Sequence, residues 1–406
     1  MKLLAETPPS SYYRKNVRFD NGERFAFMCA RSTDLPDAWV LRYALARLRQ
    51  KSINLANRVV DSLCLFYEWA ENEGIDVAQR LGSGDLFSPI EVENLSEFMR
   101  TSKKAPLDIK GLKVKRVVVG NTHKDRMKRV VAFVEWRMSH LTLAMTDQSR
   151  VYMVNARLAV LKNVAANIRG SKQKQRNALT DEELEFLMQV IRPDDPRNPF
   201  APHTRHRNFC IVLFFVELGM REAEPLVLKS EHVNVAGRYP GISIVPNPND
   251  PEEHRTDPPL VKTAGRDLPI SPLLAFFMDE YIMKWRTRQP GHKRNPYIFL
   301  ETNGGAAMSL DAQYDIFRIL RARFPGDLPA DLSSHKLRHT WNSRFRRLAA
   351  EYGWPEPFRR IINNYIMGWN KTSEQDARYA HSEIVREAAK ILRALHAPTD
   401  AMKAGA

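Results

Sequence analysis

A short polar segment constrains the fold of this chain more than any other feature of its sequence. Residues 170–176 read Gly-Ser-Lys-Gln-Lys-Gln-Arg and contain no apolar side chain. Helical hydrophobic periodicity precedes this segment, and directly after it Thr180-Asp-Glu-Glu183 forms a capping-box pattern that starts a new helix. A polar, basic segment between two such regions is typical of an interdomain linker. The 406 residues are therefore predicted to form two domains.

The first domain is predicted over 36–169, after an N-terminal extension over 1–35, and it is helical. Two stripes of apolar residues at helical spacing indicate helices that pack as short antiparallel neighbours in a bundle. They are Met127, Val130, Val134 and Met138, and then Val154, Leu158, Leu161 and Ala165.

The second domain is predicted over 177–406, with helices at both ends and short strands between them. The strands are Ile242–Val245, Leu260–Lys262 and Arg266–Ile270, and a Thr-Ala-Gly turn joins the last two as a hairpin. Five prolines over 246–259 mark an irregular insertion before this hairpin. The predicted fold class is mainly α, with a small antiparallel sheet in the C-terminal domain.

The charge of the chain indicates a polyanionic partner. The sequence has 62 Lys and Arg against 47 Asp and Glu, a net charge of +15. Ten of these cations and only two Asp lie over 101–130, a local balance of 10 − 2 = +8. Nucleic acid is the first candidate partner and an anionic membrane surface the second. A solvated surface with no partner is the simpler interpretation of any charge run.

Cysteine usage and hydropathy favour a cytoplasmic protein. The three cysteines lie far apart, without the spacing of a disulfide framework or of metal ligands. The first ten residues do not form a signal peptide, and the most apolar stretch, 209–220, is too short to span a bilayer. No metal, cofactor or membrane is expected.

Arg221 follows the predicted end of an apolar helix at Gly219, where its guanidinium can leave the core, and Glu224 could hold it in place. Lys262 lies beside the predicted tight turn. In isolation, Arg221 and Glu224 could form a surface ion pair, and Lys262 could be a solvated edge residue.

His335 and Arg338 lie three residues apart, after Ser333 and Ser334, either of which can cap a helix. They occupy the first helical turn, where the dipole and the free N–H groups favour an anion such as phosphate. Further on, Trp369 follows a glycine and Tyr379 lies ten residues later. By themselves these two would be a half-buried Trp and a helix-surface Tyr.

The order of these motifs resembles the tyrosine recombinase (integrase) family. Four segments carry the resemblance, and weaker similarity extends over 36–168, which looks like that family's helical core-binding domain. The segments are Leu218-Gly-Met-Arg221 with Glu224 and Leu228; Val261-Lys262-Thr263 with Arg266-Asp-Leu-Pro269; His335-Lys-Leu-Arg338-His-Thr340; and Met367-Gly-Trp369 with Tyr379-Ala-His381. Most relatives have His where this chain has Trp369.

The resemblance implies a site-specific DNA recombinase of a mobile element, with Tyr379 as the nucleophile. Arg221 and Arg338 would clamp the phosphate oxygens, and Lys262 would protonate the leaving 5′-oxygen. His335 would assist proton transfer, Trp369 would donate a hydrogen bond, and Glu224 would support Arg221. The charge pattern adds candidate DNA contacts at Lys124, Lys128, Arg129, Lys172, Lys174 and Arg176.

Double-stranded DNA is the expected partner, and the protein is expected to associate with the nucleoid. Two copies would bind each site and four would form the recombining complex. Residues 382–397 have an amphipathic pattern, and in this family such a terminal helix often docks into a neighbouring protomer; packing on its own domain is the alternative. Two further functions remain open: a type IB topoisomerase-like nicking-closing enzyme, and an inactive DNA-binding relative.

Overall fold

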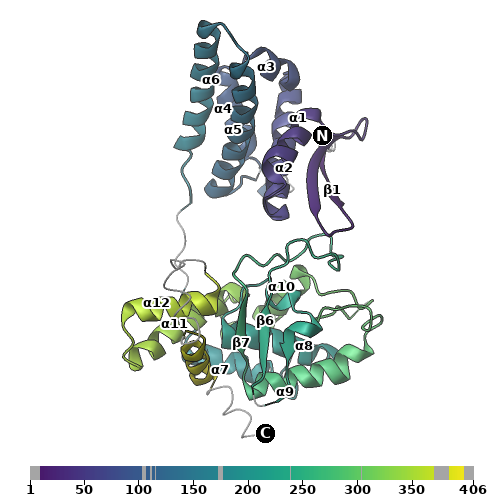
Figure 1. The fold of residues 1–406 in the computed structure, drawn as a ribbon, viewed down its shortest axis with the longest axis vertical. Helices are drawn as coiled ribbons and strands as arrows, with labels where there is room; N and C mark the ends of the chain where they lie inside the picture. Colours follow the sequence, from purple (N-terminus) through teal and green to yellow (C-terminus); the bar gives the residue numbers. More distant parts are fainter. Residues whose placement is uncertain are drawn as a thin grey trace. The chain divides into compact units, whose positions relative to one another are not determined.

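The computed structural model describes residues 10–102, 107–109, 112–114, 116–171, 177–237, 239–302, 304–369 and 384–396. The chain separates into two compact units, 1–174 and 175–406. Both units are mainly helical with small antiparallel sheets, so the predicted fold class is confirmed (Figure 1). No helix in the described part of the chain is long and apolar enough to cross a membrane.

In the first unit, helix α5 packs against α2, α4 and α6, and each helix turns an apolar stripe inward. The stripes predicted from Met127 and from Val154 are buried on α5 and α6. The helices of the unit are α1 (Ala38–Tyr43, continued by a π-helical turn over Ala44–Leu48), α2 (Ile53–Asn72), α3 (Val77–Ser83), α4 (Pro89–Arg100), α5 (Gly120–Leu143) and α6 (Gln148–Asn167).

Two hairpins in the first unit were not predicted. Strands β1 (Tyr12–Arg18) and β2 (Arg24–Ala30) pair within the N-terminal extension and pack on α2. Strands β3 (Leu107–Ile109) and β4 (Leu112–Val114) pair inside the basic stretch. β3 and β4 are only three residues long, shorter than the runs of about four to eight residues from which a strand is predicted.

The second unit is built around α8 (Pro202–Leu218), whose residues from Arg207 to Leu218 are all buried. α9 and α11 pack against α8, and a three-stranded antiparallel sheet runs β5–β6–β7. The elements are α7 (Asp181–Val190), β5 (Val233–Asn234), β6 (Gly241–Ile244), β7 (Arg266–Pro269), α9 (Pro272–Glu280), α10 (Leu310–Arg323), α11 (Ser334–Glu351) and α12 (Glu356–Met367).

The predicted hairpin around Lys262 is wrong. β7 pairs with β6, with Ile242 opposite Leu268, and residues 260–262 form no strand. The proline-rich segment is therefore part of one long connection over 245–265, inside the hairpin and not before it. Pro lacks the N–H that a strand partner needs, which disfavours regular pairing over 246–259.

The helix over 384–396 packs on the core of its own unit. Ile391 and Leu392 are fully buried there, and Arg344 of α11 donates to the carbonyl of Leu395 at 3.0 Å. His396 is 1% exposed, and its Nε2 lies 3.9 Å from a carboxylate oxygen of Glu217 on α8. This arrangement is the alternative that the sequence left open for the terminal helix.

His396 should make the stability of the second unit depend on pH. Burial lowers the pKa of this imidazole to about 3, well below its ordinary 6.5. The unfolded chain therefore binds the proton first, so stability is complete above pH 6.5 and falls as the pH decreases from there. For one group that is protonated only in the unfolded chain, each further pH unit lowers the free energy of unfolding by about 1.4 kcal/mol.

We expect His396→Gln, which does not titrate, to lose less unfolding free energy than the native chain between pH 6.5 and 5.5. Hydrogen exchange of the α8 amides in the full chain measures this difference. Equal pH slopes in the two proteins would contradict it.

Candidate active site

Arg221 lies just beyond the end of α8. Gly219 closes that helix with a φ of +57°, and a Cβ there would approach the Trp341 ring to 2.8 Å. Only glycine therefore lets α11 pack this closely against the end of α8. Arg221 follows two residues later and is half-buried, and burial lowers the pKa of its guanidinium. The helix end predicted at Gly219 is confirmed.

Arg338 connects the ends of two helices. It lies in the first turns of α11, which Ser333 caps by accepting a hydrogen bond from the Lys336 N–H at 3.3 Å. Its Nη1 donates to the carbonyl of Gly219 at 2.5 Å, and its Nη2 donates to the carbonyl of Met367 at 3.3 Å. Burial lowers its pKa to about 10, so the guanidinium stays charged at neutral pH.

Arg338 lies near Trp369 and within electrostatic reach of Arg221. The charge of Arg221 contributes to lowering the pKa of Arg338, after burial, so the two cations lie within electrostatic reach. The Arg338 guanidinium carbon is 5.8 Å from the centre of the Trp369 ring, which is 41% exposed. Like charges held together in a half-buried place favour an anion between them.

The buried carboxylate of Glu224 links the segments of Arg221 and Arg266. Its side chain is 1% exposed and accepts from Thr263 Oγ1 at 2.5 Å and from both terminal nitrogens of Arg266 at 3.1 Å. It also accepts from the backbone N–H of Arg221 at 2.8 Å. Burial alone would raise the pKa of this carboxyl, but Arg266, Thr263 and the Arg221 N–H together outweigh burial and lower it. Glu224 was expected to hold Arg221; it does so through the backbone, and its ion-pair partner is Arg266.

Thr263 and Arg266 are the residues that the sequence interpretation missed. Arg266 donates to the carbonyl of Ile366 at 2.7 Å, and Ala264 donates to the carbonyl of Gly368 at 3.1 Å. The chain beside Lys262 is thus fixed to the segment that carries Trp369. A signal was available: strand alternation places Arg266 on the same buried face as Leu268, where a charge needs a partner.

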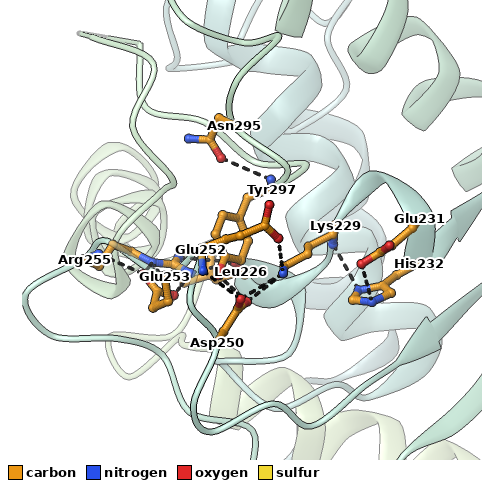
Figure 2. A network of polar contacts seen from close by, with 10 residues as sticks. All are labelled: Leu226, Lys229, Glu231, His232, Asp250, Glu252, Glu253, Arg255, Asn295 and Tyr297. Carbon is orange, nitrogen blue, oxygen red and sulfur yellow. Dashed lines mark hydrogen bonds and ion pairs between the residues drawn. The ribbon is translucent and has the colours of Figure 1, made fainter. Parts of the chain in front are cut away.

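A second polar network anchors the connection that carries Lys262 (Figure 2). The buried Lys229 binds Asp250 at 2.8 Å and Glu252 at 2.6 Å, and Tyr297 donates to Asp250 at 2.8 Å. Arg255 donates to the carbonyls of Leu226 and Met308. The irregular insertion is therefore tied to the segment that directly follows Glu224. Lys262 is exposed, and in the sequence it lies between the residues of this network and Thr263.

Of the two remaining site residues predicted from the sequence, the structure describes His335 but not Tyr379. His335 lies exposed in the first turn of α11, on the helix face of Arg338. Tyr379 lies outside the described residues. Among the described residues, no group of three or more His, Cys, Asp or Glu side chains could hold a metal ion.

In the first unit, Arg129 lines a cavity of about 870 Å³ between α2 and α5, together with Arg58 and Arg126. Lys128 is exposed on α5, and the half-buried Lys124 reaches the carbonyl of Ala166 at 3.5 Å. The three linker cations lie outside the described residues: Lys172, Lys174 and Arg176.

Comparison with known proteins gives structural likenesses only. No protein-family model matches the sequence, and no curated protein matches it. Solved structures that resemble this one include the Tn1549 transposon integrase with transposon right end DNA, at 15% identity and TM-score 0.45, covering 79% of this chain and 98% of that one. The XerH recombinase bound to palindromic difH substrate matches at 16% identity and TM-score 0.40, covering 84% and 87%. A lambda integrase dimer bound to a COC′ core site matches at 15% identity and TM-score 0.33, covering 93% and 96%.

Proposed function

We propose that this chain is a tyrosine recombinase: it cleaves and rejoins DNA at specific sites through a 3′-phosphotyrosyl intermediate, and it integrates or excises a mobile element. The position of Arg338 relative to Arg221 and Trp369 supports this proposal. Arg221 and Arg338 are 117 positions apart in the sequence (338 − 221), yet Arg338 donates to the carbonyl of Gly219, two residues before Arg221, and lies beside Trp369. A phosphodiester in a DNA backbone is the anion that this place fits.

The chemistry requires a nucleophile that stores the bond it breaks. The hydroxyl oxygen of Tyr379 attacks the phosphorus, its proton passes to His335, and the 5′-oxygen leaves with a proton from Lys262. The phosphotyrosyl ester conserves the bond energy, so a 5′-hydroxyl can reverse the step without a nucleoside triphosphate. No cofactor is required.

Arg221, Arg338 and Trp369 stabilise the charge that develops on the phosphorane. The guanidiniums bind the nonbridging oxygens, and the indole N–H of Trp369 donates one further hydrogen bond. The contacts among Glu224, Thr263 and Arg266 hold the segment of Arg221 beside the segment of Lys262. A lysine on an anchored connection loses less freedom when it meets the leaving oxygen.

The first unit and the linker bind duplex DNA. Lys124, Lys128 and Arg129 on α5 and the linker cations Lys172, Lys174 and Arg176 contact phosphates, which gives affinity without sequence information. Strand exchange between two duplexes requires two copies of the chain at each site and four in the recombining complex.

Covalent capture tests the function and identifies the target site in one experiment. The full chain is incubated with fragmented DNA of its source genome, denatured in detergent, recovered by an affinity tag, and the attached DNA is sequenced. We expect adducts concentrated at a few short sites, joined through a 3′-phosphate. Paired copies of a recovered site on one plasmid should then recombine.

Two outcomes would contradict this proposal, and each would support a different function. Relaxation of supercoiled plasmid, with adducts spread over many sequences and no recombination, would indicate a type IB topoisomerase-like enzyme. Specific DNA binding without any adduct would indicate an inactive relative.

A further inference from the structure

A second imidazole touches His335. His339 lies one turn further along α11, and the Nε2 atoms of the two rings are 3.2 Å apart. The ring centres are 4.6 Å apart, and the planes are nearly perpendicular at 84°. Residues four apart on a helix share one face, so α11 itself brings the two rings together. His335 is exposed and His339 is half-buried, so the inner ring can orient the outer one.

This contact restricts where the protons lie. In a neutral imidazole one ring nitrogen donates and the other accepts. Two Nε2 atoms at hydrogen-bond distance therefore require one ring to carry its proton on Nε2 and the other to carry it on Nδ1. The contact cannot form when both Nε2 atoms are protonated, since both would then be donors. A partner that restricts one nitrogen of a histidine in this way sets the tautomer of that histidine.

We propose that His339 is a positioning residue for His335: it holds the His335 ring in one orientation and one tautomer for proton transfer at the nucleophile. This inference rests on the proposed function, in which His335 exchanges a proton with Tyr379. In this role His339 acts through the Nε2 contact with His335.

A double-mutant cycle on single-turnover adduct formation tests this role in the full chain. We expect His339→Leu, which cannot hydrogen-bond, to slow the step by about tenfold, a loss of about 1.4 kcal/mol in transition-state stabilisation. His339→Gln should recover most of that rate, because its amide nitrogen can reach the position of the imidazole Nε2. In a His335→Gln background, His339→Leu should have almost no further effect.

Three results would overturn the inference. They are an unchanged rate in His339→Leu, an equal loss with and without His335, and a His339→Gln variant as slow as His339→Leu. A normal thermal unfolding curve for His339→Leu shows that a slow rate is not a folding defect. These results differ from a failure of the proposed function, in which the wild-type chain itself forms no adduct.

Zinc provides a second measurement of the same geometry. Two nitrogens bound to one tetrahedral Zn²⁺ at about 2.0–2.1 Å lie about 3.3 Å apart, which matches the spacing of this pair. We expect added Zn²⁺ to inhibit adduct formation by the wild-type chain at a concentration at least tenfold lower than it inhibits His339→Gln. Equal inhibition of both proteins would show that the two rings do not converge in solution.

Discussion

Replacing Tyr379 by Phe is expected to abolish DNA cleavage and to leave DNA binding intact. The change removes only the hydroxyl oxygen that forms the phosphotyrosyl ester, so every charged contact to the DNA remains. Detergent-resistant adducts on a recovered site measure cleavage, and gel mobility shift on the same duplex measures binding.

Tyr365 provides the matched control for this substitution. Its hydroxyl donates to the carbonyl of Asp267 on β7 at 3.0 Å, so it has a structural role beside the site. Tyr365→Phe should still form the adduct. An adduct that persists in Tyr379→Phe and disappears in Tyr365→Phe would reverse the assignment of the nucleophile.

Replacing Arg338 by Ala is expected to reduce the rate of cleavage by about 10²–10³-fold, the usual effect of losing one preorganised donor to a transition-state anion. Arg221→Ala should have an effect of the same order. Arg338 also binds the carbonyls of Gly219 and Met367, so its loss separates the ends of α8 and α12. Single-turnover adduct formation at saturating protein isolates the cleavage step from DNA binding.

Arg318→Ala is the control for lost positive charge. This exposed residue of α10 pairs with Asp315 on the same helix. Cleavage by Arg318→Ala should stay near the wild-type rate. Near-normal turnover in Arg338→Ala would remove this residue from the phosphate clamp.

Local signals were sufficient to predict three helix ends. The helix end at Gly219, the serine cap of α11 and the capping box formed by Thr180 and Glu183 all appear as predicted. Each is set by a few consecutive residues that satisfy helix-end N–H or C=O groups. The order of the Arg221, Lys262, His335–Arg338 and Trp369 segments could also be read directly from the sequence.

The strand predicted at 260–262 is wrong because strand formation depends on a partner that can be distant in sequence. A strand exists only if a partner pairs with it, and the partner of β7 is β6, more than twenty residues earlier in the chain. The hairpin β1–β2 was also missed; its strand β2 packs on α2 and buries Ala26, Met28 and Cys29.

The helical character of both units, the helix ends at Thr180, Gly219 and Ser333, and the candidate residues of the site could all be predicted from the residues alone. Which charged groups pair with one another became visible only in the folded chain. Glu224 pairs with Arg266, Lys229 anchors the connection that carries Lys262, and the helix over 384–396 packs on its own unit. The physical reason is that a buried charge must find a partner of opposite sign in space, and this chain offers many possible partners at every distance in sequence.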